Sequence, residues 1–464
     1  MKTRIEHDSL GERRIPIDAY YGVQTHRAVE NFPISGLRPL PEYVDATVHI
    51  KRAAAIVNNK LGLLSSRKSR AIVRAADEIL GGMFREWFVV DVYQAGAGTS
   101  HNMNVNEVLA NRAIELLGGT RGNYRIVHPN DDVNMSQSTN DVCPTAIRIA
   151  ALIKVKGLLG HLASLENVFK KKARAFDSVV KSGRTHLQDA VPVRLGQEFG
   201  AYAKNLAKHL TAIAGAADSS RELGIGGTAV GTGLNAHPRY RRMMTVQLSR
   251  QLRTKFQMAG DYFEAMQSLR PMVQLSGALR NLAQDLIRIA NDIRLLASGP
   301  KTGLAELKLP PVQPGSSIMP GKVNPVMAEM LNMVCFQVIG CDLTILMAAQ
   351  AGQLELNVMM PVVAFNLLHE IEILSNAIDV FERFCIRGIA ADSARGRMFA
   401  ESSMGIVTVL NPHIGYAKAA EIAKEYLLTG KPVRQILKER GIFTEIEIAR
   451  IFDVRAMTEP GIRK

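Results

Sequence analysis

The sequence has few cysteines and almost no tryptophan. One tryptophan and four cysteines (Cys143, Cys335, Cys341 and Cys385) occur in 464 residues, with no CxxC pair and no zinc-site spacing. This excludes a disulfide scaffold and predicts reduced thiols in a cytoplasmic protein. No run of 18 apolar residues is present, so we expect no membrane-spanning helix. The charged start MKTRIEHDSLGERR lacks the apolar core of a secretory signal.

Acidic residues are in deficit. The chain has 57 Lys and Arg against 43 Asp and Glu, a net charge of +14. The basic residues are spread along the chain, with Lys170–Lys172 as the tightest run, and no RNA- or DNA-binding motif accompanies them. We therefore expect a solvated basic surface and no nucleic-acid partner. At most, this field favours small anionic ligands.

Long helical patterns dominate the middle of the sequence. From Pro144 to Phe176 apolar residues recur every three or four positions, with Pro144 in a first helical turn, and the pattern resumes after Pro192. Further helices are expected over 272–298, 325–350 and 358–386. Long apolar stripes bury best against each other, which predicts a mainly α protein with a helix bundle.

Some of these helices are apolar on more than one face. The pattern is clearest at Met327, Met330, Leu331, Val334 and Val338. Such helices belong in a large core, here one shared between subunits, so we expect a homo-oligomer. Composition shifts divide the chain into a mixed, mostly helical N-terminal domain (1–140), a central bundle (141–390) and a small helical C-terminal domain (391–464).

Four segments are polar or glycine-rich and lie at the ends of helical runs. They are rich in neutral hydrogen-bond donors, and donors at helix N-termini form anion sites. Helix capping is the alternative explanation, and it stays open for any single segment. The segments are Gly96–Val108, His128–Thr145, Gly183–Pro192 and Gly315–Val326. Their candidate ligand-binding residues are Thr99, Ser138, Thr139, Asn140, Thr185, His186, Ser316, Ser317, Lys322 and Asn324.

The last segment, GSSIMPGKVNPV, predicts a mobile lid. Gly315 and Gly321, each preceded by proline, bracket a short polar loop. Lys322 would give a carboxylate ligand a point charge, and Asn324 would fix its orientation.

GSSIMPGKVNP also resembles the signature loop of the aspartase/fumarase superfamily. The other three segments match the conserved regions of that family in order, and the resemblance runs from Asp18–Gly22 to the NPHIGY stretch at Asn411. The resemblance implies a three-domain, mostly α-helical protomer and a homotetramer whose core pools the long helices. It further implies active sites built from three subunits, and an elimination reaction that releases fumarate from a small dicarboxylate.

Three segments are more similar to aspartases than to fumarases. GAGTS (96–100) stands where fumarases typically read GSGTQ. SQSTND (136–141) stands where fumarases usually have SSN at positions 138–140. AGQLELNV (351–358) is also similar to aspartases. Aspartate ammonia-lyase activity is the first expectation, fumarase the alternative, and a lyase for a substituted aspartate the third. Two residues depart from the pattern. Met360 stands where aspartases commonly have Glu and fumarases often have Arg, and His101 is expected in neither.

The resemblance assigns roles to the candidate residues. Thr99, Ser138, Thr139 and Ser317 would hold the β-carboxylate of the substrate. Thr185, His186, Lys322 and Asn324 would hold the α-carboxylate, and Asn140 would place the amino group. Spacing alone does not choose between Ser316 and Ser317 as the base, and the family favours Ser316. Glu329 would pair with His186 and raise its pKa.

The sequence argues against two other classes of function. Gly224–Ala229 matches the GxGxxA dinucleotide fingerprint, but a helix precedes it and a loop follows, so we expect no NAD site and, by resemblance, a loop that supports the active site. A non-catalytic relative would have lost part of the serine, lysine and histidine set, and none is missing. The 11 histidines form no metal-ligand pattern, and we expect neither metal nor cofactor.

Overall fold

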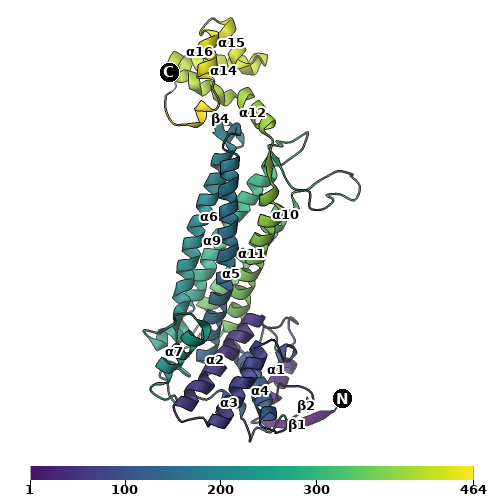
Figure 1. Cartoon of the computed structure of the whole chain (residues 1–464), viewed down its shortest axis with the longest axis vertical. Helices are drawn as coiled ribbons and strands as arrows, with labels where there is room; N and C mark the ends of the chain where they lie inside the picture. Colours follow the sequence, from purple (N-terminus) through teal and green to yellow (C-terminus); the bar gives the residue numbers. More distant parts are fainter. Residues whose placement is uncertain (1, 463–464) are drawn as a thin grey trace. The chain divides into compact units, whose positions relative to one another are not determined.

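The computed structural model describes residues 2–462 and is mainly α-helical, as the sequence predicted (Figure 1). The α-helices are α1 (Val23–Asn31), α2 (Pro41–Lys60), α3 (Ser66–Leu80), α4 (Thr99–Leu116), α5 (Thr139–Ala175), α6 (Leu195–Asp218), α7 (Tyr240–Leu252), α8 (Tyr262–Gln267), α9 (Arg270–Leu296), α10 (Val326–Gln350), α11 (Met360–Phe384), α12 (Ser393–Ser402), α13 (Asn411–Ile414), α14 (Tyr416–Thr429), α15 (Val433–Glu439) and α16 (Glu445–Ile451).

The strands are short and pair two by two. In residues 2–462 the antiparallel pairs are β1–β2, β3–β4 and β7–β8, and the parallel pair is β5–β6. Their bounds are β1 (Thr3–Asp8), β2 (Gly11–Pro16), β3 (Val180–Thr185), β4 (Gln188–Arg194), β5 (Glu222–Leu223), β6 (Gln257–Met258), β7 (Leu307–Lys308) and β8 (Ala390–Ala391). The sequence pattern had not indicated these strands.

The predicted long helices are present. The bounds of α9, α10 and α11 agree with the apolar periodicity within two residues at each end.

The start of α5 was predicted wrongly. Ser138 Oγ accepts the N–H of Asn140 at 3.2 Å and Asp141 Oδ1 accepts the N–H of Ser138 at 2.9 Å, so the helix is capped and begins at Thr139. Pro144 therefore lies inside the helix, where its ring removes one backbone hydrogen bond.

The chain divides into two compact units, and each long helix from α5, α6, α9, α10 and α11 contributes residues to both. Unit 1 comprises Met1–Gly160, Thr211–Ala283 and Val334–Asn376, and unit 2 the remaining ranges His161–Leu210, Gln284–Met333 and Ala377–Lys464. The three-domain division of the sequence stays a prediction.

Each unit has its own apolar core besides the packed long helices. In unit 1, α2, α3 and α4 bury a cluster that includes Val48, Ile72 and Leu109. In unit 2, the C-terminal helices bury Ile422, Ile436 and Phe452 among others.

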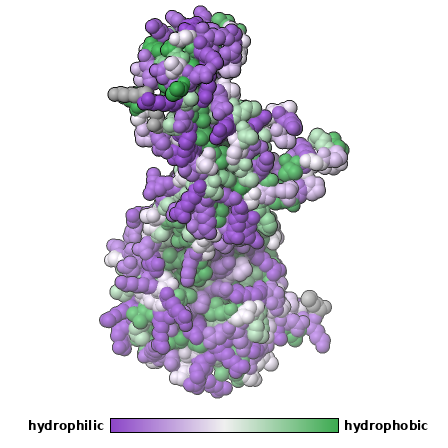
Figure 2. Space-filling view, turned by 45° about the horizontal axis from the view of Figure 1, so that its top comes forward, coloured by the Kyte–Doolittle hydropathy of each residue, from purple (hydrophilic) through white to green (hydrophobic). Residues whose placement is uncertain are grey.

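Helix α10 exposes an apolar stripe. By length and composition Val326–Gln350 is apolar enough to cross a membrane, and 39% of its most apolar window is buried. Met333, Phe336, Leu343 and Met347 are all exposed, at spacings of three, seven and four that place them on one face. Hydrophobic surface is visible between polar residues along the helical part of the chain (Figure 2).

Candidate active site

The first two polar segments lie against each other in unit 1. A 3₁₀ turn at Gly96–Gly98 leads directly into α4, whose first residue is Thr99. Gly98 has φ +89°, and a Cβ there would collide with Cys143 Sγ on α5. Glycine thus allows the N-termini of α4 and α5 to approach. As a result, Asn102 Nδ2 donates to Thr139 Oγ1 at 3.1 Å.

The loop with the dinucleotide-like pattern holds the start of α5. The backbone N–H groups of Gly226 and Thr228 donate to Asp141 Oδ2 at 2.9 and 3.0 Å. Asn140 Nδ2 donates to the carbonyl of Ala229 at 2.8 Å, which leaves the Asn140 carbonyl oxygen to accept from another group. Burial raises the pKa of Asp141 to about 6. The loop amides thus bind a carboxylate of this chain, that of Asp141 at the start of α5.

Two hydroxyls of this region keep a hydrogen to donate. Ser138 Oγ accepts from the N–H of Asn140, so the capping interpretation is correct for this residue. Thr139 Oγ1 accepts from Asn102. In both cases the oxygen is occupied as an acceptor while the O–H hydrogen is left for a ligand, so capping and ligand binding are compatible here.

The third segment forms the turn of a hairpin in unit 2. Thr185 pairs with Gln188, and the two residues between them, His186 and Leu187, have φ of +55° and +60°. Two-residue turns with positive φ usually contain Asn and Gly, so His and Leu are strained here. The buried Glu306 carboxylate anchors the hairpin by accepting from Lys181 Nζ at 3.0 Å and Arg184 Nη2 at 2.9 Å. The exposed His186 is therefore held on a rigid support.

The fourth segment is a loop before α10 that closes on itself. The N–H of Gly315 donates to the carbonyl of Lys322 at 2.8 Å, and a Cβ on Gly315 would collide with that oxygen. Asn324 Nδ2 donates to the carbonyl of Gly315 at 2.6 Å. Ser316 Oγ accepts the N–H groups of Ile318 and Met319 at 3.2 and 3.0 Å. Two backbone dipoles thus point at this serine oxygen, which favours its ionised form.

A cavity of about 870 Å³ opens beside this loop within unit 2. Lys322 and Asn324 line it, together with Arg294, Lys301, Lys308 and Arg395, against one carboxylate, Asp392. The excess of cationic side chains attracts small anions.

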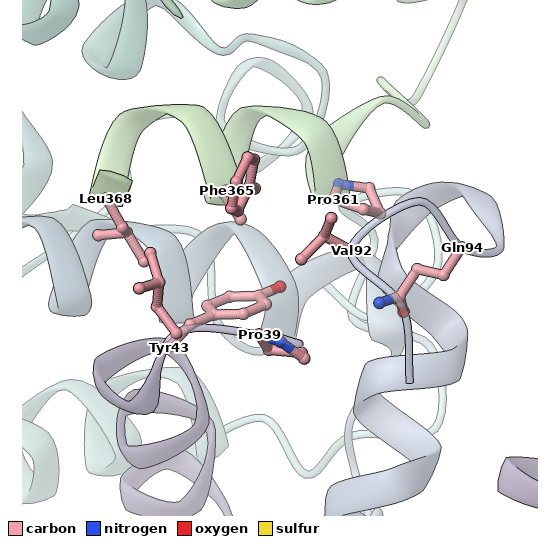
Figure 3. A pocket seen from close by; sticks show the side chains of 9 residues that line it. Pro39, Tyr43, Val92, Gln94, Pro361, Phe365 and Leu368 are labelled. Atoms are coloured by element: carbon pink, nitrogen blue, oxygen red, sulfur yellow. The ribbon is translucent and has the colours of Figure 1, made fainter. Parts of the chain in front are cut away.

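The pocket in Figure 3 is different in kind. It is lined by Tyr43, Pro361, Phe365 and other mostly apolar residues, and its volume of about 10 Å³ holds no more than one water. No predicted site residue lines it. We assign it no ligand.

The two departures from the family pattern are buried near the GAGTS turn. The His101 ring stacks on Tyr43 with centroids 4.2 Å apart and lies 2.9 Å from Thr47 Oγ1, and burial lowers its pKa to about 3. Met360 is fully buried and lies two residues after Val358, whose carbonyl accepts the N–H of Ala97 at 2.8 Å. Both residues are packed in the interior, and His101 is neutral.

Sequence reasoning missed a buried lysine of α2. Lys51 is 0% exposed, and burial lowers its pKa to about 7. Its Nζ donates to Asn134 Oδ1, from the second polar segment, at 2.7 Å. Its position on the helix could have indicated this burial. The residues on the same helical face, at spacings of three, four and seven, are also buried: Thr47, Val48, Ala55 and Asn58.

The structure divides the predicted site residues between the two units. Thr99, Ser138, Thr139 and Asn140 lie together in unit 1, and Thr185, His186, Ser316, Ser317, Lys322, Asn324 and Glu329 belong to unit 2. Within residues 2–462 no hydrogen bond or ion pair joins His186 to Glu329, so that pairing stays a prediction. In the same range no three His, Cys, Asp or Glu side chains gather to hold a metal ion.

Comparison with known protein families gives two matches. Residues 11–340 match the family described as lyase, and residues 406–459 match the one described as the fumarase C C-terminus. The chain is 49% identical over 459 residues to an aspartate ammonia-lyase of a Bacillus species, covering 99% of this chain and 98% of the relative. It is 46% identical to the aspartate ammonia-lyase of Helicobacter pylori, with 98% of each chain covered.

Solved structures are similarly close. The cobalt-bound fumarate lyase:delta crystallin of Brucella melitensis is 49% identical and superposes with a TM-score of 0.96, covering 99% of this chain and all of that one. The class II fumarase of Schistosoma mansoni has the same TM-score and coverage at 39% identity.

Proposed function

The chain belongs to the aspartase/fumarase superfamily of lyases, and we propose that it is an aspartate ammonia-lyase, which converts L-aspartate to fumarate and ammonia. The observation that carries this proposal is the similarity to aspartate ammonia-lyases over almost the whole chain. The complete set of candidate site residues supports an active enzyme, because every serine, threonine, lysine and histidine of the family pattern is present.

The difficult step is removal of the C3 proton. It gives a carbanion drawn as an aci-carboxylate, with two negative charges on the β-carboxyl group. Donors fixed in advance around that group stabilise it as charge builds. We assign this task to Thr99, Ser138, Thr139 and Ser317, of which Ser138 and Thr139 have hydroxyl hydrogens left to donate. The α-carboxylate is bound by Thr185, His186, Lys322 and Asn324.

Ser316 is the proposed base. A serine removes a proton from carbon only when its hydroxyl is ionised, and the N–H groups of Ile318 and Met319 favour the alkoxide. The charge of Lys322 adds to this once the loop closes over substrate and excludes water. Asn140 accepts from the ammonium group through its free carbonyl oxygen. Metal ions and cofactors have no step in this mechanism.

The proposed assembly is a cytoplasmic homotetramer with sites shared by three subunits. The exposed stripe of α10, Met333, Phe336, Leu343 and Met347, suits packing against the same helix of other copies. Assembly would bring the unit 1 residues of one chain to the unit 2 residues of two others. All four cysteines are free and buried, as expected for the reducing cytoplasm.

Fumarate formation, followed by its ultraviolet absorbance, tests the activity. We expect purified protein to form fumarate from L-aspartate and not from L-malate. Formation from L-malate alone would make the chain a fumarase and overturn the proposal.

Lys322→Ala separates binding from rate. Because the ammonium serves the bound substrate and the transition state alike, we expect KM to rise by about 10- to 100-fold, the value of one charge-assisted contact, with kcat lowered as well. Lys301→Ala, which removes an equal charge from the same cavity, is the control, and its KM should stay near that of the parent. An unchanged KM in Lys322→Ala would contradict the carboxylate assignment.

A further inference from the structure

A buried lysine without a contacting carboxylate lies behind the start of α5. Lys51 Nζ has three N–H donors, and its hydrogen-bond acceptor is Asn134 Oδ1 at 2.7 Å. Within the described part of the chain no carboxylate oxygen lies at ion-pair distance from it. The ionisable groups that face it are Asp141, Cys143 and His101.

Asp141 does not neutralise Lys51 by contact. Both Asp141 oxygens are already occupied by backbone N–H groups, those of Ser138, Gly226 and Thr228. Burying an ammonium group without a negative partner lowers the stability of the fold. A protein therefore keeps such a group where a negative charge, for example that of a bound ligand, compensates for it.

Hydrogen bonds lead from Lys51 to the candidate site. Asn134 Oδ1 also accepts from Asn102 Nδ2 at 3.2 Å, and the same amide nitrogen donates to Thr139 Oγ1 at 3.1 Å. Asn106 Nδ2 adds a third donor to Asn134 Oδ1 at 3.3 Å. The relay Lys51–Asn134–Asn102–Thr139 therefore ends on a hydroxyl that accepts from Asn102 and has its own hydrogen left to donate.

We propose that Lys51 is a positioning residue for the β-carboxylate site, which acts through Asn134 and Asn102 on the hydroxyl of Thr139. The inference rests on the proposed function. The hydroxyls around the β-carboxyl group are neutral, whereas the aci-carboxylate gains a full negative charge. Protonated Lys51 places a cation in the buried layer behind them, where low polarity makes its stabilisation of that charge strong. By holding Asn134 Oδ1, the acceptor that it shares with Asn102 Nδ2, Lys51 also fixes the orientation of the Asn102 amide against Thr139.

A double-mutant cycle of Lys51→Met and Thr139→Val tests the inference. We expect each single variant to lower kcat for L-aspartate by ~10²–10³-fold, as for loss of one donor to a developing charge, with a smaller change in KM. Because both act through one hydroxyl, the double variant should be within about threefold of the slower single variant. Losses that multiply would show that Lys51 acts independently of Thr139 and would overturn the inference.

Lys154→Met is the matched control. Lys154 is also a largely buried lysine of unit 1, on α5, with 8% of its side chain exposed, but it pairs with Glu42 at 2.7 Å and Glu372 at 3.5 Å. Its replacement should lower stability, leave kcat within about threefold of the wild type and show no coupling to Thr139→Val.

If Lys51→Met does not fold, Asn102→Ala breaks the relay without removing a buried charge, and the same coupling to Thr139 is expected. Wild-type protein that forms no fumarate from aspartate would refute the proposed function itself, a different result from multiplying losses in an active enzyme.

Discussion

Replacing Ser316 with alanine is expected to lower turnover of L-aspartate by ~10²–10⁴-fold, the usual contribution of a general base. The physical reason is local. Ser316 Oγ accepts two backbone N–H groups in a loop closed by the Gly315–Lys322 hydrogen bond. Alanine removes the oxygen and both of these hydrogen bonds, whereas the Gly315–Lys322 backbone hydrogen bond that closes the loop stays. Steady-state kinetics would measure the effect, on variant protein whose native mass shows the same oligomeric state as the wild type.

Ser317→Ala is the matched control for that variant. Ser317 is assigned to the β-carboxylate that gains charge in the transition state, so its loss should lower kcat by ~10²–10³-fold, as for Thr139→Val, while leaving measurable turnover. Activity of Ser316→Ala within tenfold of the wild type would remove Ser316 as the base. Abolished turnover in Ser317→Ala alone would move the role to its neighbour.

Mixing two variants of strongly lowered activity is expected to restore activity. If Thr139 and Ser316 of one site come from different chains, a Thr139→Val chain supplies an intact Ser316 and a Ser316→Ala chain an intact Thr139. Random reassembly of equal amounts then gives both intact residues to about a quarter of the sites in a closed symmetric oligomer. Unfolding and refolding the mixture, followed by the fumarate assay, measures this fraction.

The control for complementation is the double variant. Chains that carry both Thr139→Val and Ser316→Ala have no intact partner to offer and should stay inactive after the same treatment. Activity of the mixture no greater than that of the separately refolded parents would show that each site draws these residues from a single chain.

Periodicity predicted the long helices well because burial of a wide stripe fixes the spacing of apolar residues. Periodicity did not predict helix starts and turns, which depend on individual side-chain and backbone hydrogen bonds. The start of α5 depends on the Ser138–Asp141 cap, and Pro144 alone suggested a later start. The β3–β4 hairpin turns at His186 and Leu187, which give none of the usual Asn-Gly signal.

The sequence predicted the candidate site residues of the polar loops. It did not predict the buried residues behind them, such as Lys51. Hydroxyl and amide residues in Gly-rich segments stand out in a helical sequence, and family resemblance gave them roles. Lys51 did not stand out, because a single lysine in an apolar helix is normally exposed. Its burial depends on Asn134, far along the chain, and such pairing has no local pattern.

A crystal structure of the Ser316→Ala protein with L-aspartate bound tests the proposed shared active site most directly. We predict one ligand held by three chains, with Thr99, Ser138 and Thr139 of the first at its β-carboxylate. Lys322 and Asn324 of the second and Thr185 and His186 of the third should then contact the α-carboxylate. L-Aspartate bound by residues of one chain only, or away from the four polar segments, would contradict it.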